Sequence, residues 1–461
     1  MKSLILLLIV AMLNVLSVCG QQDSIQIKGH LINNSHFPRV LVQKYNVGTV
    51  NVASAPIENE KFSITAPPNL EPGVYRLQYS QSSKYDYVEV IINGKEKNIA
   101  FSIDLNQPER PVTFTASKVN KAWHDYQNQK NRQLQNIASS QQLMANYSDP
   151  KAAIVIQSKA ALKKDIERYN AHRNRFLSAQ GTSWAAQMVK NRPVYFANPF
   201  ASLQLQDYNR QEHFWDGIDT TNPKLINSPL YTEHILTYVQ YYMGADRGFS
   251  ADQIVEELIK CVDTIMQKFG GHKMTQYFAL KYLQLGFKEI GHEELLQHID
   301  KTYQELILSF TEDKKEQSDF KQRMAGYETL KPGNQAPSAN FMSPEGTFFD
   351  LKEVKNKHTV LAFWASWCPS CEEQMPLVEA YAKNHSDVTV VAVSLDEDKE
   401  EFTSAIENYP SMKHSCDFKN YEGQVVSDYY IYASPTFIVL DDEHKIVGKY
   451  SNWEAAEKGL H

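Results

Sequence analysis

Hydrophobic and polar residues alternate with a period of two from about residue 24 to about residue 115. This alternation is typical of strands that bury one face and expose the other. Turn-forming residues such as Glu71-Pro72-Gly73 and Asn93-Gly94 separate the alternating runs. The pattern predicts about seven short strands packed as a small antiparallel sandwich. The clearest runs are residues 24–28, 61–65, 74–79 and 85–90.

The character of the chain changes over residues 116–326, which are rich in Gln, Lys, Glu and Ala at helical spacing. No proline interrupts residues 151–192. We therefore expect a region of packed helices here, one of which begins at the N-cap Ser250 and ends at Gly270-Gly271. The sequence Leu330-Lys331-Pro332-Gly333 predicts the linker into a last domain.

The last domain contains an apolar run, residues 359–364, that predicts a buried parallel strand. The sequence Trp367-Cys368-Pro369-Ser370-Cys371 follows it, and residues 372–377 then predict a helix. A thiolate at a helix N-terminus has a lowered pKa, because the positive end of the helix dipole stabilises its charge. The second sulfur, one turn later, lies on the same helix face. This arrangement suits dithiol redox chemistry.

Residues 362–371 (AFWASWCPSC) resemble the extracytoplasmic TlpA/ResA-like branch of the thioredoxin family. Residues 333–337 (GNQAP) and 388–396 (VTVVAVSLD) resemble other segments of that branch, and residues 434–441 (SPTFIVLD) resemble its cis-proline loop and the following strand. The resemblance covers about residues 330–461. It implies a thioredoxin fold there, preceded by the β-domain and helical insert of Bacteroidetes-type members.

The resemblance further implies that the protein is a thiol:disulfide oxidoreductase. Cys368 would attack a partner protein and Cys371 would resolve the mixed disulfide. Pro435 would form a cis peptide bond facing the disulfide. The other residues expected to contact substrate are Trp367, Pro369 and Ser434, the last through its backbone.

The resemblance favours reduction of envelope proteins that carry thiols or disulfides, with electrons supplied by a membrane redox protein. No cofactor is implied beyond the redox-active Cys368–Cys371 disulfide. Relatives keep a buried acid at one of two places, but these are occupied here by Ala362 and Gln374. Glu373 is the candidate to replace that acid as the proton acceptor.

The CxxC motif has two other interpretations, a zinc half-site and a local structural disulfide. Zinc normally takes four ligands, and no second CxxC or HxxxH motif accompanies this one, so we expect no metal.

Cys261 lies on an apolar helical stripe and is expected to be a buried apolar residue. Cys416 is interpreted as a partly buried structural thiol, with a third redox cysteine as the alternative.

The formal net charge of −7 and the pI near 6.1 argue against nucleic-acid binding, as does the absence of a concentrated basic stripe. The acidic run at residues 396–401 (DEDKEE) predicts the start of a helix, where acids favour the N-terminus. It lacks the glycine and the spacing of an EF-hand.

The N-terminus has one lysine, Lys2, followed by an apolar run over residues 4–18. This pattern predicts a signal peptide over residues 1–20, and hence export to the periplasm or cell envelope. Lipidation of Cys19 and an uncleaved anchor remain alternatives. The predicted order is then signal peptide, β-sandwich domain (21–115), α-helical region (116–326) and thioredoxin-like domain (330–461).

Two other classes of function stay open. In the first, the protein binds an envelope ligand or partner and its redox domain is auxiliary. His213, near Trp215 and Asp216, could line a pocket in that case, although a helical histidine with satisfied hydrogen bonds is the simpler interpretation. In the second, the protein is a structural envelope protein whose CxxC is inert.

Overall fold

The computed structural model of the protein describes residues 24–461, except 35–36, 68–69, 81–85, 108–111, 148, 150, 199–200, 244–250 and 291. The predicted signal peptide, the Cys19 lipidation site and the Ser250 N-cap lie outside the described residues. The chain divides into two compact units. One contains residues 1–244 and 265–279, and the other contains residues 245–264 and 280–461.

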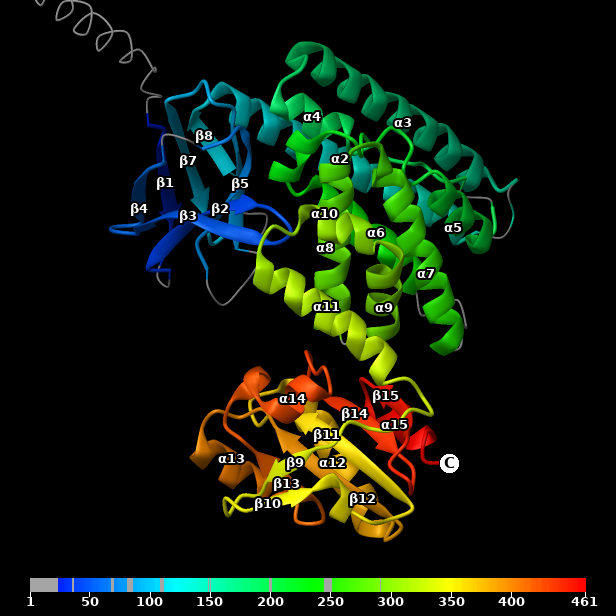
Figure 1. Ribbon diagram of the computed structural model, residues 1–461. Helices are drawn as coiled ribbons and strands as arrows, with labels where there is room; N and C mark the ends of the chain where they lie inside the picture. The colour runs from blue at the N-terminus through cyan, green and yellow to red at the C-terminus, as the bar shows by residue number, and fades with distance from the viewer. Residues whose placement is uncertain are drawn as a thin grey trace, which may run out of the picture. The chain divides into compact units, whose positions relative to one another are not determined.

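The first unit opens with two four-stranded sheets in the orders β4-β1-β7-β8 and β3-β2-β5-β6 (Figure 1). Ile27 and Phe101 of the first sheet share one core with Val42 and Leu77 of the second, which confirms the predicted sandwich. The described strands are β1 (Gln26–Ile32), β2 (Arg39–Tyr45), β3 (Thr49–Pro56), β4 (Lys61–Thr65), β5 (Gly73–Gln78), β6 (Tyr87–Ile92), β7 (Asn98–Asp104) and β8 (Val112–Ala116).

The prediction that the sandwich is antiparallel throughout is wrong, because β1 pairs with β7 in parallel. A parallel pair needs a long connection between its strands. Here the connection includes β2 to β6, so it is long enough. Alternation of polar and apolar residues predicts which face of a strand is buried, but it does not predict the strand's neighbour.

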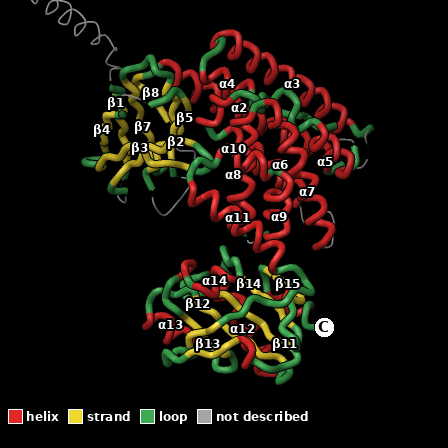
Figure 2. Tube along the Cα trace, in the orientation of Figure 1, coloured by secondary structure: helices red, strands yellow, loops and turns green. Residues whose placement is uncertain are grey.

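Helices follow the sandwich in the first unit, as the coloured tube in Figure 2 shows. The two long helices, α2 (Lys118–Ala145) and α3 (Ala153–Gln180), pack around a core that includes Ile137, Leu162 and Tyr169. The helices that begin in this part of the chain are α2 (Lys118–Ala145), α3 (Ala153–Gln180), α4 (Trp184–Lys190), α5 (Leu203–Glu212), η1 (Pro223–Asn227) and α6 (Leu230–Met243).

Further helices lead to the last domain, and two of them, α7 and α8, contribute residues to both units. Within the second unit, the buried Asp300 accepts hydrogen bonds from Gln284, Arg323 and Tyr327. These bonds join three of the helices. The elements are α7 (Ala251–Lys268), η3 (Phe269–Gly271), α8 (Lys273–Glu289), α9 (Glu293–Thr302), α10 (Gln304–Phe310) and α11 (Lys314–Thr329).

The C-terminal domain contains a five-stranded sheet in the order β13-β12-β11-β14-β15. The strands are β11 (His358–Trp364), β12 (Val388–Ser394) and β13 (Lys413–Cys416), which run in parallel, and β14 (Thr436–Leu440) and β15 (Ile446–Tyr450), which are antiparallel to their neighbours. The remaining elements are the hairpin β9 (Asn340–Met342) and β10 (Phe348–Asp350), the helices α12 (Pro369–Asn384), α13 (Lys399–Ile406), α14 (Gln424–Asp428) and α15 (Trp453–Lys458), and the 3-10 turns η4 (Leu351–Glu353) and η5 (Asn420–Glu422).

This architecture confirms the predicted α/β thioredoxin fold. Residues 359–364 of the central strand β11 are buried, as their apolar run predicted. Because β11 and β12 are parallel, the residues that follow both strands meet at one edge of the sheet. That edge contains the CxxC motif. Within the described residues, no helix is both long enough and apolar enough to span a bilayer.

Candidate redox-active site

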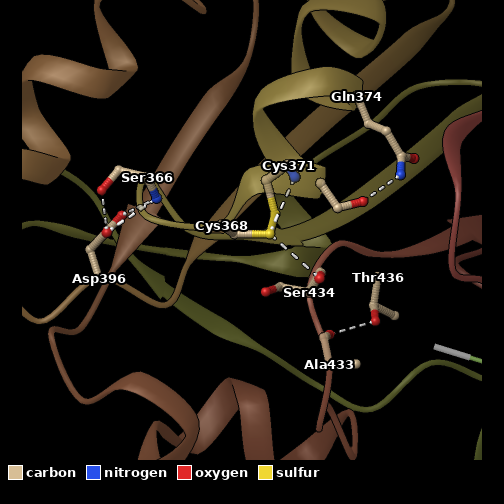
Figure 3. Close-up of a disulfide and its surroundings, with 9 residues drawn as sticks. Ser366, Cys368, Cys371, Gln374, Asp396, Ala433, Ser434 and Thr436 are labelled. Carbon is tan, nitrogen blue, oxygen red and sulfur yellow. Dashed lines mark hydrogen bonds between the residues drawn. A yellow bond between two sulfur atoms is a disulfide. The ribbon is translucent and has the colours of Figure 1, made fainter. Parts of the chain in front are cut away.

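Cys368 and Cys371 form a disulfide at the N-terminus of α12, with their Cα atoms 5.2 Å apart (Figure 3). Cys368 is the N-cap residue, and the Cys371 N–H donates to its Sγ at 3.2 Å. Pro369 occupies the first helical turn, where its missing N–H costs nothing. The sulfur of Cys368 therefore lies at the positive end of the helix dipole, where a thiolate is stabilised.

Both cysteines of the pair have little accessible surface. In the disulfide form Cys368 is 5% exposed, and Cys371 is 1% exposed. The backbone at Ser434 lies against the site, since its carbonyl oxygen is 3.5 Å from the Cys368 Sγ. The exposed apolar surface beside the disulfide belongs to Trp367, which is 50% exposed.

The loop that contains Ser434 enters β14, which pairs with β11. This pairing places Thr436 opposite Phe363, close to the end of β11 from which the CxxC motif continues. The Ser434–Pro435 bond is cis, which confirms the predicted geometry. The Thr436 hydroxyl donates to the Ala433 carbonyl at 2.8 Å and closes the loop (Figure 3). The substrate contacts expected of Trp367, Pro369, Ser434 and Pro435 stay predictions.

Glu373 and Gln374, the two positions on α12 considered for a proton acceptor, have different surroundings. Glu373 is exposed, and among the described contacts its carboxylate has no hydrogen bond or ion pair. The Gln374 side chain bridges two helices. Its Oε1 accepts from the Trp453 N–H at 2.7 Å, and its Nε2 donates to the Ser370 hydroxyl at 3.1 Å. The Gln374 amide is therefore part of the packing between α12 and α15, and the role of Glu373 stays a prediction.

The other described cysteines, Cys261 and Cys416, are free thiols. Cys261 is fully buried on α7, which confirms its predicted burial, and that burial raises the pKa of its thiol. Cys416 ends β13 and is 1% exposed, so it is more buried than the sequence suggested. Its S–H donates to the Asp396 carbonyl at 3.3 Å, and burial raises the pKa of this thiol too.

The zinc alternative would need further ligands near the cysteine pair. Over the part of the chain that the structure describes, no group of three or more His, Cys, Asp or Glu residues could hold a metal ion. His213 pairs with Asp216 at 2.8 Å and stacks on Tyr195. These three residues contribute to the lining of a pocket of about 520 Å³ in the helical region of the first unit.

Sequence reasoning missed a buried carboxylate beside the CxxC loop. The acidic run was interpreted as a helix start, and Asp398 is indeed the N-cap of α13. Asp396, however, is 0% exposed and accepts hydrogen bonds from Ser366 (Figure 3) and from Ser394. Its position could have been a signal, because it follows the apolar strand β12, whose parallel neighbour β11 leads into the CxxC motif.

Comparisons with known proteins agree with this geometry. Residues 331–457 match the Redoxin family. Thiol-disulfide oxidoreductase ResA of Bacillus thuringiensis subsp. konkukian is 25% identical over 134 residues, which cover 28% of this chain and 76% of that protein. Thioredoxin-like protein YneN of Bacillus subtilis is 28% identical over 141 residues, which cover 28% of this chain and 79% of that protein. The chain is a thioredoxin-like thiol:disulfide oxidoreductase.

Two solved structures are also similar to this oxidoreductase. A thiol-disulfide oxidoreductase from Bacteroides fragilis is 28% identical, with a TM-score of 0.26, and the match covers 28% of this chain and 97% of the other. A thioredoxin-like protein from Bacteroides caccae is 15% identical, with a TM-score of 0.39, and the match covers 58% of this chain and 97% of the other.

Proposed function

We propose that this oxidoreductase is exported and uses the Cys368–Cys371 pair to reduce disulfides in proteins of the cell envelope. The observation that carries the proposal is the position of the Cys368 sulfur. It lies at the N-terminus of α12, 3.5 Å from the Ser434 carbonyl and next to the half-exposed Trp367. This position combines a stabilised thiolate with a surface that a partner chain can approach.

The reaction begins with the reduced pair. The Cys368 thiolate attacks one sulfur of the partner's disulfide, forms a mixed disulfide and expels the other partner sulfur as a thiolate, which takes up a proton. The Cys371 thiolate then attacks the Cys368 sulfur and expels the second partner sulfur as a thiolate, which also takes up a proton. The partner gains two electrons and two protons, and the Cys368–Cys371 disulfide is formed.

The cis-proline loop is the proposed docking edge for the partner. An extended partner segment would pair with the backbone at Ser434, in the manner of an added strand. Trp367 would cover the apolar side of that segment, and Pro369 and Pro435 would flank the disulfide. Because backbone hydrogen bonds hold such a segment, this mode of binding accepts partners of varied sequence.

The proposed direction of electron flow and the proposed location rest on the sequence. The resemblance to the TlpA/ResA branch favours reduction, with a membrane redox protein as the electron donor. Export is supported by the signal-peptide pattern of residues 1–20, with lipidation at Cys19 as the alternative form. The reduction potential of the pair in the full-length protein tests the direction, because a reductant needs a low potential.

We predict that Gln374→Glu speeds turnover at neutral pH. Resolution requires deprotonation of Cys371, which is only 1% exposed and has no acid at the two places where relatives keep one. The new carboxylate could still accept from the Trp453 N–H, and the Ser370 hydroxyl could turn to donate to it. The measurement is the insulin-reduction rate as a function of pH, with Glu373→Gln as the matched variant. A large loss in Glu373→Gln with no gain in Gln374→Glu would assign the proton acceptor to Glu373 instead.

A further inference from the structure

Asp396 lies beside the segment that leads to Cys368, and its carboxylate is completely buried. The Ser366 N–H donates to both carboxylate oxygens, each at 3.2 Å. The Ser366 hydroxyl donates to Oδ1 at 2.6 Å, and the Ser394 hydroxyl donates to Oδ2 at 2.6 Å. The Ser394 oxygen in turn accepts from the Asp396 N–H at 2.9 Å. Both carboxylate oxygens are therefore occupied.

These bonds connect the ends of two neighbouring strands. Beyond the register of β11 and β12, the Leu395 N–H donates to the Trp364 carbonyl at 2.8 Å. The Asp396 bonds to Ser366 are the next connection along the chain. A turn then follows, in which the Cys368 N–H donates to the Ala365 carbonyl at 3.3 Å. The segment from β11 to the first cysteine is thus fastened to the residues that follow β12.

A carboxylate suits this place better than its amide counterpart. Three donor groups converge on the two oxygens: the partly buried N–H and hydroxyl of Ser366, and the buried hydroxyl of Ser394, which needs an acceptor. Hydrogen bonds to an ionised acceptor are also stronger than bonds between neutral groups. An asparagine would offer one oxygen and would turn an NH₂ group toward at least one of these donors.

We propose that Asp396 is a positioning residue for thiol:disulfide exchange. It acts through Ser366, holding the chain before Cys368 so that the sulfur stays at the N-terminus of α12 and beside the Ser434 carbonyl. The inference rests on the proposed function, in which Cys368 is the attacking group. Because its oxygens are already occupied by Ser366 and Ser394, Asp396 does not replace the proton acceptor sought at Glu373.

The test compares Asp396→Asn with the full-length parent protein. Iodoacetamide labelling of Cys368 is followed against pH in a Cys371→Ser background, and insulin reduction is followed with both cysteines present. We expect the labelling midpoint to rise by about one pH unit and insulin reduction to slow about tenfold, because the sulfur loses its fixed place at the helix N-terminus. Asp398→Asn is the matched control, since Asp398 is an exposed cap of α13 in the same acidic run and should leave both values unchanged.

A fall in the labelling midpoint of Asp396→Asn would overturn the proposal, because it would show that the carboxylate acts only as a nearby negative charge. An unchanged midpoint with an unchanged insulin rate would overturn it as well. If the wild-type protein does not reduce insulin at all, the proposed function fails. If the wild type reduces insulin and Asp396→Asn has the same labelling midpoint and the same insulin-reduction rate, only this inference fails.

Ser366→Ala keeps the question answerable if Asp396→Asn does not fold. This variant removes the 2.6 Å hydroxyl bond and keeps the backbone donor, so the same two changes should appear in smaller degree. Where both variants fold, their effects should be less than additive, since the two residues act through one set of bonds. The proposal would be contradicted if the effects of the two substitutions on the labelling midpoint and on the insulin-reduction rate were fully additive. It would also be contradicted if Ser366→Ala left both quantities at their wild-type values.

Discussion

Cys371→Ser is expected to accumulate mixed disulfides with partner proteins, whereas Cys368→Ser is expected to trap none and to lose disulfide reduction entirely. Cys368 caps the helix and lies beside the exposed Trp367. Cys371 is within the first turn of α12 and is 1% exposed, so a partner sulfur reaches Cys368 first. Without Cys371, the bond between Cys368 and the partner has no internal thiol to break it.

The trapping experiment uses the full-length chain expressed in cells and separated on non-reducing gels. Species that disappear on reduction should be abundant for Cys371→Ser and missing for Cys368→Ser and for the double variant. Cys261 and Cys416 are buried and are kept in every variant, so any capture through them would also appear with the double variant, which serves as the control. Equal trapping by the two single variants would refute the assigned order of attack.

Asp300→Ala is expected to destabilise the second unit by about 3 kcal/mol, because it leaves Arg323 without its carboxylate. Asp300 is 0% exposed and accepts from Arg323 Nε at 2.6 Å, from the Tyr327 hydroxyl at 2.8 Å and from Gln284 Nε2 at 2.6 Å. The Arg323 side chain is 32% exposed, so part of its charge can reach water. The expected loss therefore lies at the low end for a broken buried pair.

Hydrogen exchange of α9 and α11, followed together with urea unfolding, would measure this loss. Glu316→Ala is the matched control, because it breaks a pair with Lys281 whose side chains are 50% and 34% exposed. An exposed pair of this kind contributes about 0–1 kcal/mol. If the two variants lose the same stability, the buried Asp300 cluster does not hold these helices together.

Local patterns were sufficient to predict much of the redox site. Residues 359–364 form an unbroken apolar run, and they are a buried central strand. A helix was predicted after the CxxC motif, at residues 372–377, and α12 contains them, although it begins three residues earlier at Pro369. The cis bond at Pro435 came from the family resemblance rather than from the pattern, since nothing local distinguishes it from a trans bond.

What could not be predicted depends on contacts between distant segments. Asp396 stands among acidic neighbours that cap a helix, and only the parallel pairing of β11 with β12 brings it to Ser366. Asp300 likewise lies on a helix whose spacing indicates burial of one face, but its partners come from α8 and α11. The parallel pairing of β1 with β7 likewise depends on a contact between segments that are distant in the sequence. Periodicity describes the faces of single elements, whereas these features depend on which elements become neighbours.

The reduction potential of the Cys368–Cys371 pair tests the central claim most directly. The full-length protein would be equilibrated in thiol–disulfide buffers of known potential, and its reduced fraction would be read by alkylation. A reductant of envelope disulfides should have a potential near that of thioredoxin, roughly −270 mV. A potential near roughly −120 mV, typical of a strong oxidant of proteins, would contradict the proposed direction of electron flow.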